Sequence, residues 1–279
     1  MKIFLFPGQG TQKAGMERLL LAAYPDLAYI YNIGSEILGY DLRGLTDEDL
    51  THTKYAQPAI FACSVTSFKS REAMGDIAFK PFAVAGHSLG EFSAMVASEV
   101  LTLEDGFKVI KARAEAMEKC AEQTKGAMVA VLKLPVETIE TVCNETEGFV
   151  TIANYNSDNQ TVIAGEVAAV NLASEKLKEL KGRCVPLKTA GAFHTKLMQP
   201  AADEYLTKID NITFNNPTCE FYSNVTGKKL SDFTDFKALT AKHIVSPVRF
   251  AQEVKAFKKD GCDEFFECEP SGVLTKLIQ

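Results

Sequence analysis

A serine at position 88 stands between two glycines in the stretch VAGHSLGEFSA, residues 84–94. The pattern Gly-x-Ser-x-Gly, here Gly86, Ser88 and Gly90, is typical of a sharp turn from a strand into a helix, because glycine has no Cβ to clash in so tight a bend. Such a turn holds the hydroxyl out of the sheet, where the backbone N–H of Leu89 can stabilise an oxyanion. The sequence therefore predicts a nucleophile, although a phosphate-binding or purely structural turn would carry the same pattern.

A serine nucleophile needs a base, and the chain has four histidines. His87 adjoins Ser88, so its side chain diverges from the hydroxyl, and we expect it to support the loop. His52 precedes the nucleophile in a polar stretch. His194 and His243 both follow at separations that suit a base. Spacing alone does not choose between these two, and either could be an ordinary core or surface histidine.

One arginine lies on the apolar side of a predicted helix. At 100° per residue, the helix expected over 104–121 places Arg113 between Ile110 and Met117 in the middle of its apolar face. A guanidinium keeps its proton, so its burial requires an anionic partner, and its planar fork matches a carboxylate. An internal salt bridge to a core Asp or Glu is one solution. Beside a serine nucleophile, however, Arg113 indicates an acyl donor that carries its own free carboxylate.

The elements that must position these residues indicate an α/β fold. Short apolar strands are predicted at 2–6, before a Pro/Gly turn, and at 82–85, directly before the glycine-flanked serine. Helical periodicity follows Ser88 and returns over 104–121, where Thr102 is a plausible N-cap. This alternation of strand and helix predicts a parallel sheet covered by helices.

The middle of the chain follows a different order of elements. We predict strand 127–132, helix 135–144, strand 149–154, strand 161–164, helix 166–180 and strand 184–187. The order βαββαβ is typical of a ferredoxin-like unit. We therefore expect a small ferredoxin-like domain at 126–188, inserted into a large α/β-hydrolase-like domain formed by 1–125 and 189–279. A small-molecule site is expected in the cleft between them.

Composition narrows the classes of function. The chain has 279 residues, with 30 Lys and Arg against 36 Asp and Glu, and the net charge of −6 leaves no broad basic face for nucleic acid. Its seven scattered cysteines indicate reduced thiols, and their spacing does not favour a metal site. The apolar stretch 3–6 is too short for a signal peptide and no run could span a membrane, so we expect a cytoplasmic protein.

Seven segments and Arg113 together point to one family. They are FPGQGTQ at 6–12, QPAI at 57–60, GHSLGE at 86–91, ANYNSDNQTVIAG at 153–165, GAFHTKLMQPA at 191–201, SNVTG at 223–227 and SPVRF at 246–250. In this order the chain resembles the malonyl-CoA:acyl carrier protein transacylases, including the free-standing acyltransferases that serve polyketide synthases. The resemblance runs nearly from end to end.

The resemblance implies a ping-pong transfer through an ester on Ser88. Ser88, activated by His194, would take the malonyl group from malonyl-CoA, and the phosphopantetheine thiol of an acyl carrier protein would then remove it. Gln9 and the Leu89 N–H would form the oxyanion hole. A backbone carbonyl near Ser246, in place of an acidic side chain, would orient His194.

The resemblance also assigns the substrate pocket. Arg113 would grip the malonyl carboxylate, and Gln57 and His87 would line the pocket. Phe193, in the sequence AFH, would crowd an α-methyl branch, a discrimination worth about 1–3 kcal/mol. Two positions depart from the family pattern: Glu269 stands where a Gly-Pro-Gly turn commonly has glycine, and Ser246 stands where asparagine is frequent.

Malonyl-CoA and an acyl carrier protein are the implied partners of the chain. Coenzyme A would be a product, and no bound cofactor, metal, nucleic acid or membrane is expected; the resemblance favours a monomer. Because the carrier protein is expected to be acidic, cations near the cleft should meet it, and the candidates are Lys181, Arg183, Lys188 and Lys196. The pathway, fatty acid or polyketide, stays open.

Three other functions share part of this pattern. An acyl hydrolase of the same fold would use water as acceptor and clear carrier proteins, but the charge of Arg113 would serve no simple acyl chain. A generic serine esterase would require neither Gln9, Gln57 nor a buried arginine. A catalytically silent module would bind carrier proteins without forming an adduct on Ser88.

Overall fold

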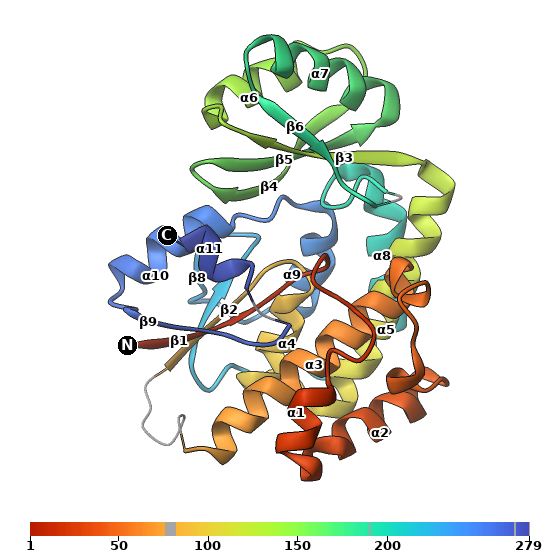
Figure 1. Cartoon of the computed structure of the whole chain (residues 1–279), viewed down its shortest axis with the longest axis vertical. Helices are drawn as coiled ribbons and strands as arrows, with labels where there is room; N and C mark the ends of the chain where they lie inside the picture. The colour runs from red at the N-terminus through yellow and green to blue at the C-terminus, as the bar shows by residue number, and fades with distance from the viewer. Residues whose placement is uncertain (76–81, 190, 271, 279) are drawn as a thin grey trace.

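A computed structural model describes residues 1–75, 82–189, 191–270 and 272–278, and these form two sheets (Figure 1). The larger sheet has the strand order β8-β7-β2-β1-β9. Its strands are β1 (Lys2–Phe6), β2 (Phe82–Gly86), β7 (Glu220–Ser223), β8 (Lys228–Lys229) and β9 (Glu264–Glu267). All neighbours pair in parallel except β8, which is antiparallel to β7 at one edge. The predicted parallel sheet is confirmed.

Helices cover both faces of this sheet, which explains why β1 and β2 are apolar on both sides. Phe4 and Phe6 point into one core, whereas Ile3 and Leu5 point into a second core on the opposite face. The helices of the first core are α1 (Arg18–Ala23), α2 (Ala28–Leu38), α3 (Thr53–Ala73), α4 (Gly90–Ala97), α5 (Leu103–Thr124), α8 (Gln199–Lys208) and α9 (Phe236–Val245). Those of the second core are α10 (Phe250–Lys259) and α11 (Leu274–Ile278). Among the helices of the described ranges, none has the length and apolarity needed to cross a membrane.

Helix α5 begins where its capping residue predicts. The Thr102 hydroxyl accepts a hydrogen bond from the backbone N–H of Asp105 at 3.1 Å, which confirms the predicted N-cap. The helix continues to Thr124, one turn beyond the predicted end, and stops where Lys125 takes a left-handed conformation with φ of 47°. Its length matters because Arg113 sits at its centre.

The smaller sheet is antiparallel, with the order β4-β5-β3-β6 (Figure 1, top). Its elements in chain order are β3 (Gly126–Leu132), α6 (Val136–Asn144), β4 (Val150–Ser157), β5 (Gln160–Glu166), α7 (Val167–Glu179) and β6 (Arg183–Pro186). Both helices pack on one face around a third apolar core. The predicted ferredoxin-like βαββαβ arrangement is confirmed, while the domain limits assigned to it stay a prediction.

Strand β4 is longer than the sequence predicts, because it has partners on both edges. On one edge it pairs with β5 through a tight hairpin in which Ser157 faces Gln160. On the other edge, the Tyr155 N–H donates to the Val248 carbonyl at 2.8 Å, and the Val248 N–H donates to the Ala153 carbonyl at 2.9 Å. The polar residues after 154 therefore form a strand, and this backbone pairing joins the smaller sheet to the segment before α10.

The turn between β2 and α4 is held by close backbone packing. The His87 N–H donates to the Phe6 carbonyl at 2.9 Å, so the turn lies against the end of β1. A Cβ at Gly90 would collide with that same carbonyl oxygen, and a Cβ at Gly86 would collide with the Glu91 backbone nitrogen. Glycine is thus required at both positions by the approach of neighbouring backbone.

We expect Gly90→Ala to lower the free energy of unfolding by about 3 kcal/mol, because backbone at the centre of the fold must shift to admit a methyl group. Thermal and urea unfolding would measure this change. Gly44→Ala is the matched control, since its nearest neighbour would be the exposed Asp41 side chain at 3.3 Å. Equal stability of the two variants would contradict the packing argument.

Candidate active site

Three predicted residues meet at the turn between β2 and α4. The Ser88 Oγ lies 2.7 Å from Nε2 of His194, which stands in the segment before α8. From α5, Nη2 of Arg113 donates a hydrogen bond to the same Ser88 Oγ at 3.2 Å. The hydroxyl therefore contacts one imidazole and one guanidinium. His243, the other candidate base, lies behind His194, with ring centroids 5.4 Å apart.

The hydrogen bonds of His194 determine which ring nitrogen carries its proton. Nδ1 lies 3.1 Å from the His243 carbonyl oxygen and 3.2 Å from the Ser246 carbonyl oxygen. Carbonyl oxygens only accept, so Nδ1 carries the hydrogen and Nε2 presents a lone pair to Ser88. Burial, assisted by the positive charge of Arg113, lowers the pKa of His194 to about 3. The imidazole is therefore neutral near pH 7 and able to accept a proton.

Arg113 is fully buried, with 0% of its surface exposed, as its place on the helix predicts. Its Nη1 donates to Oε1 of Gln57 at 2.5 Å, and its guanidinium carbon lies 5.0 Å from the centre of the Phe92 ring. Burial lowers the pKa of Arg113 to about 10, so it stays charged at neutral pH. Its Nε has no hydrogen-bond partner. Across the described residues no carboxylate lies within 4 Å of this guanidinium, so it forms no internal salt bridge, and the buried Glu91 acts on it only from farther away, where its negative charge raises the pKa of Arg113.

Gln57 has a contact that the sequence does not indicate. The residue is buried in α3, and its Oε1 accepts from Arg113 while its Nε2 lies 3.6 Å from Sδ of Met117. Both polar ends of the side chain thus point to α5. Gln57 fixes the direction of the guanidinium, and this pairing between distant helices could not be read from the motif QPAI alone.

The two residues expected to form an oxyanion hole follow the ends of two paired parallel strands, β1 and β2. Gln9 follows β1, and its side-chain amide donates to Thr53 Oγ1 at 3.4 Å. Leu89 is the N-cap residue of α4, and its N–H donates no hydrogen bond within the described parts of the chain. An N–H that is free at this position is available to a ligand.

His87 and Phe193 flank the centre. The His87 ring turns away from Ser88, and its Nε2 lies 2.8 Å from Oδ1 of Asn156 on β4. Burial lowers the pKa of His87, so it too is neutral. Phe193 is buried directly before His194, within the core that contains β1 and α5.

The two departures from the family pattern are both accommodated through backbone groups. Ser246 contacts His194 through its carbonyl oxygen, a group that every residue type provides. The Glu269 carbonyl accepts a hydrogen bond from the Ser64 hydroxyl of α3 at 2.8 Å, which ties this turn to the large sheet's helices.

Sequence reasoning missed a buried polar cluster beneath the turn. Its members are Glu91, Ser223, Asn224, His243 and Glu253, each at most 2% exposed. The motifs GHSLGE and SNVTG contain three of them, but only the fold brings α4, β7, α9 and α10 together around one point.

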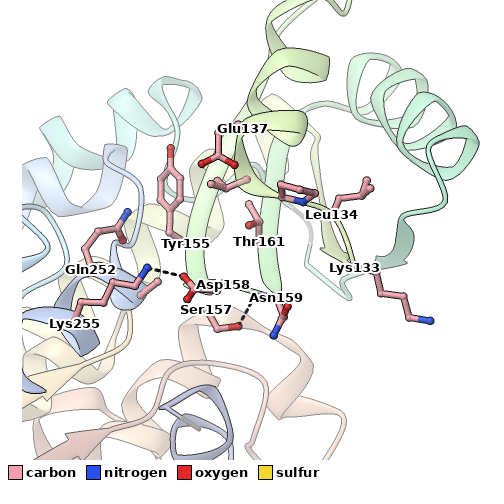
Figure 2. A pocket seen from close by; sticks show the side chains of 13 residues that line it. Lys133, Leu134, Glu137, Tyr155, Ser157, Asp158, Asn159, Thr161, Gln252 and Lys255 are labelled. Carbon is pink, nitrogen blue, oxygen red and sulfur yellow. Dashed lines mark hydrogen bonds and ion pairs between the residues drawn. The ribbon is translucent and has the colours of Figure 1, made fainter.

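A cavity of about 520 Å³ lies between the β4–β5 hairpin and α10, away from Ser88 (Figure 2). Figure 2 shows Tyr155, Asp158 and Gln252 around it, with the ion pair between Lys255 and Asp158 at 2.7 Å. None of the predicted site residues lines this cavity. Over the described ranges, no group of His, Cys, Asp or Glu side chains is arranged to hold a metal ion.

This arrangement suits nucleophilic substitution at an acyl carbon. A hydroxyl with a neutral base at hydrogen-bond distance can be deprotonated as it attacks, and a fixed cation beside it can bind an anionic part of the acyl donor.

Comparison with known proteins agrees with this chemistry. The model of the acyl transferase domain family matches residues 3–279. A malonyl CoA-acyl carrier protein transacylase of Haemophilus influenzae is 36% identical over 283 residues, covering 99% of this chain and 90% of the relative.

Solved structures have the same fold. The structure of MCAT from Streptococcus pneumoniae superposes with a TM-score of 0.92 at 40% identity, covering 100% of this chain and 92% of that one. A malonyl-transacylase in complex with a type II PKS acyl-carrier protein superposes with a TM-score of 0.93 at 32% identity, covering 100% and 92%. The chain therefore belongs to the acyl transferase domain family and, within it, to the malonyl CoA-acyl carrier protein transacylases.

Proposed function

We propose that this enzyme moves a malonyl group from malonyl-CoA to the phosphopantetheine thiol of an acyl carrier protein, through a malonyl ester on Ser88. The observation that carries the proposal is the double contact of one hydroxyl: His194 Nε2 at 2.7 Å and Arg113 Nη2 at 3.2 Å. A base beside the hydroxyl supports acyl transfer, and a buried cation beside it supports a donor with a carboxylate.

In the loading step, Ser88 Oγ attacks the thioester carbonyl carbon while its proton passes to His194 Nε2. The C–O bond forms, and the carbonyl oxygen becomes an oxyanion that the Leu89 N–H and the Gln9 amide stabilise. The C–S bond then breaks, and the proton on His194 passes to the departing thiolate of coenzyme A. The product is malonyl-Ser88 with a neutral imidazole.

In the second step, the carrier thiol gives its proton to His194 and its sulfur attacks the ester carbonyl. The bond between the acyl carbon and Ser88 Oγ then breaks, and the imidazolium returns the proton to Oγ. Both residues therefore end as they began. Hydrogen bonds from Nδ1 to the carbonyls of His243 and Ser246 keep the ring in place through both proton transfers.

Selection of the acyl group is assigned to Arg113, with Gln57 and Phe193. A buried cation with no carboxylate at hydrogen-bond distance is costly, and the free carboxylate of the malonyl group would offset that cost by accepting a hydrogen bond from the unpartnered Nε. Phe193 would crowd an α-methyl branch, which disfavours it by about 1–3 kcal/mol. We assign His87 to the wall of the pocket, where its bond to Asn156 connects the pocket to β4.

The acyl carrier protein and malonyl-CoA are the proposed partners, and the enzyme is proposed to act as a monomer without a bound cofactor. The carrier complex of a relative at 32% identity supports the first partner. Lys181, Arg183, Lys188 and Lys196 are all exposed and could meet an acidic carrier. The pathway served is fatty acid or polyketide biosynthesis.

Intact mass spectrometry after mixing with malonyl-CoA tests the proposal. We expect the wild-type mass to rise by one malonyl group, mapped to Ser88, and holo-carrier protein to remove it. Ser88→Ala should show no adduct, whereas Ser93→Ala, a buried serine of α4, should load normally. Transfer to carrier without an adduct would contradict the ester, and release of malonate despite excess holo-carrier would indicate the hydrolase.

We expect Arg113→Ala and the bulkier Arg113→Met to lower kcat/KM for malonyl-CoA by ~10–200-fold, the worth of one hydrogen bond to a charged group. Activity with acetyl-CoA, which has no carboxylate, should be retained or rise in the same preparations. The ratio of the two substrates corrects for any loss of folded protein. An unchanged preference for malonyl-CoA would remove Arg113 from this role.

The pH dependence of loading should reflect the lowered pKa of His194. The neutral ring is the active form and its pKa is about 3, so kcat/KM should stay level from pH 8 down to pH 5 instead of falling below pH 6.5. His52→Ala, a change at an exposed histidine, should leave the profile unaltered. A tenfold fall per unit below pH 6.5 would contradict the neutral buried base.

A further inference from the structure

The backbone of the nucleophile has an unusual conformation that something must hold. Ser88 has φ of 52°, in the left-handed region that residues with a Cβ rarely adopt. Such conformations persist at active sites only where surrounding contacts enforce them. The contacts that enforce this one come from a residue outside the proposed machinery.

We propose that Asn224 is the positioning residue that holds Ser88 in its reactive conformation, an inference that rests on Ser88 being the nucleophile. Asn224 directly follows β7 and is 0% exposed. Its Oδ1 accepts from the Ser88 N–H at 2.7 Å, and its Nδ2 donates to the Gly86 carbonyl at 2.6 Å. One side chain thus bridges the two residues on either side of His87.

The orientation of this amide is settled by its backbone partners. The Ser88 N–H can only donate and the Gly86 carbonyl can only accept, so the oxygen and nitrogen of Asn224 cannot exchange places. The same side chain also receives the His243 Nε2 hydrogen at 3.1 Å and donates to Glu253 Oε1 at 2.7 Å. All four hydrogen bonds that a carboxamide can form are made; three of them are buried, and the one from the Ser88 N–H is part-buried.

The backbone N–H and carbonyl of Asn224 are also hydrogen-bonded. Its N–H donates to Glu91 Oε2 at 2.7 Å, and the neighbouring Ser223 hydroxyl donates to Glu91 Oε1 at 3.0 Å. The Asn224 carbonyl accepts from the Arg249 N–H at 3.1 Å. Helix α4, strand β7 and the start of α10 are therefore tied to this one residue.

The cluster also reaches the base. His243 contacts Asn224 with its ring and contacts His194 Nδ1 with its carbonyl oxygen, at 3.1 Å each. Asn224 thus bonds directly to the nucleophile and reaches the base through one residue, His243. Because its Oδ1 occupies the Ser88 N–H, the donor that the turn can offer an oxyanion is the Leu89 N–H. Loss of the bridge would let the peptide at 87–88 relax, and a shift of about 1 Å at the nucleophile can cost ~100-fold in rate.

Asn224→Ala tests the proposal, with Tyr222→Phe as matched control. Tyr222 lies on β7, directly before Ser223 and Asn224, and its hydroxyl donates to Asp260 at 2.7 Å, so its loss removes a part-buried hydrogen bond that does not involve the turn. For Asn224→Ala we expect kcat of malonyl transfer to fall about 100-fold with KM within about threefold, because the nucleophile moves while the acyl pocket stays. Tyr222→Phe should keep kcat within about twofold, since it touches no reacting group.

Asn224→Asp keeps the shape and the acceptor for Ser88, but places an oxygen against the Gly86 carbonyl and Glu253. Its rate should fall below that of wild type, and the deficit should deepen from pH 6 to pH 9 as the new carboxyl loses the proton it could donate. Circular dichroism and thermal unfolding would establish that each variant is folded. A purely structural residue would not produce this pH dependence.

Reaction of Ser88 with phenylmethylsulfonyl fluoride separates this proposal from the proposed function. If wild type forms no malonyl adduct, the function fails, yet slower sulfonylation of the Asn224 variants than of wild type and Tyr222→Phe would still support positioning. Folded Asn224→Ala and Asn224→Asp proteins with the wild-type kcat and sulfonylation rate would overturn it. The positioning role would also be overturned if the Asn224 variants changed KM alone, or if their kcat fell no more than that of Tyr222→Phe.

Discussion

The site depends on a permanent positive charge kept in the apolar core, within hydrogen-bond distance of a hydroxyl. Such a charge is tolerated only where its hydrogen bonds and an anion offset the loss of water. In the described structure Gln57 and Ser88 take two of the guanidinium's donors, and no carboxylate within 4 Å takes the rest. Burial is the main reason that the pKa of His194 is lowered, and the positive charge of Arg113 lowers it further. The same buried cation thus contributes to substrate selection and to the neutral state of the base.

Local sequence was enough to predict the features that depend on short-range geometry. The turn at Gly86 and Gly90, the cap at Thr102 and the burial of Arg113 all follow from the steric needs of neighbouring residues or from helical spacing. The order of elements in the smaller sheet follows from alternating patterns in the same way.

Features that depend on residues far apart in the chain could not be predicted from local sequence. The bond from Gln57 to Arg113 and the cluster around Asn224 each join segments that only the fold brings together. Spacing likewise left both His194 and His243 open as the partner of Ser88, and only the family resemblance implied His194, which the structure places at hydrogen-bond distance. The extra length of β4 has the same origin, because its second partner is Val248. The type of a side chain limits the partners that it can bind, and the tertiary structure determines which of them it contacts.

The segment at 246–248 performs two tasks with its main chain alone. The amide and carbonyl of Val248 close the open edge of β4, and the carbonyl of Ser246 aims the imidazole. Neither task uses the Ser246 side chain, which is therefore free to vary, whereas the Val248 side chain is buried in the second core. An inserted or deleted residue cannot be absorbed, because a slip of one position would break the bond to the imidazole and the pairing between the two sheets together. Tolerance to substitution at Ser246 and intolerance to changes in length therefore coincide in this short stretch.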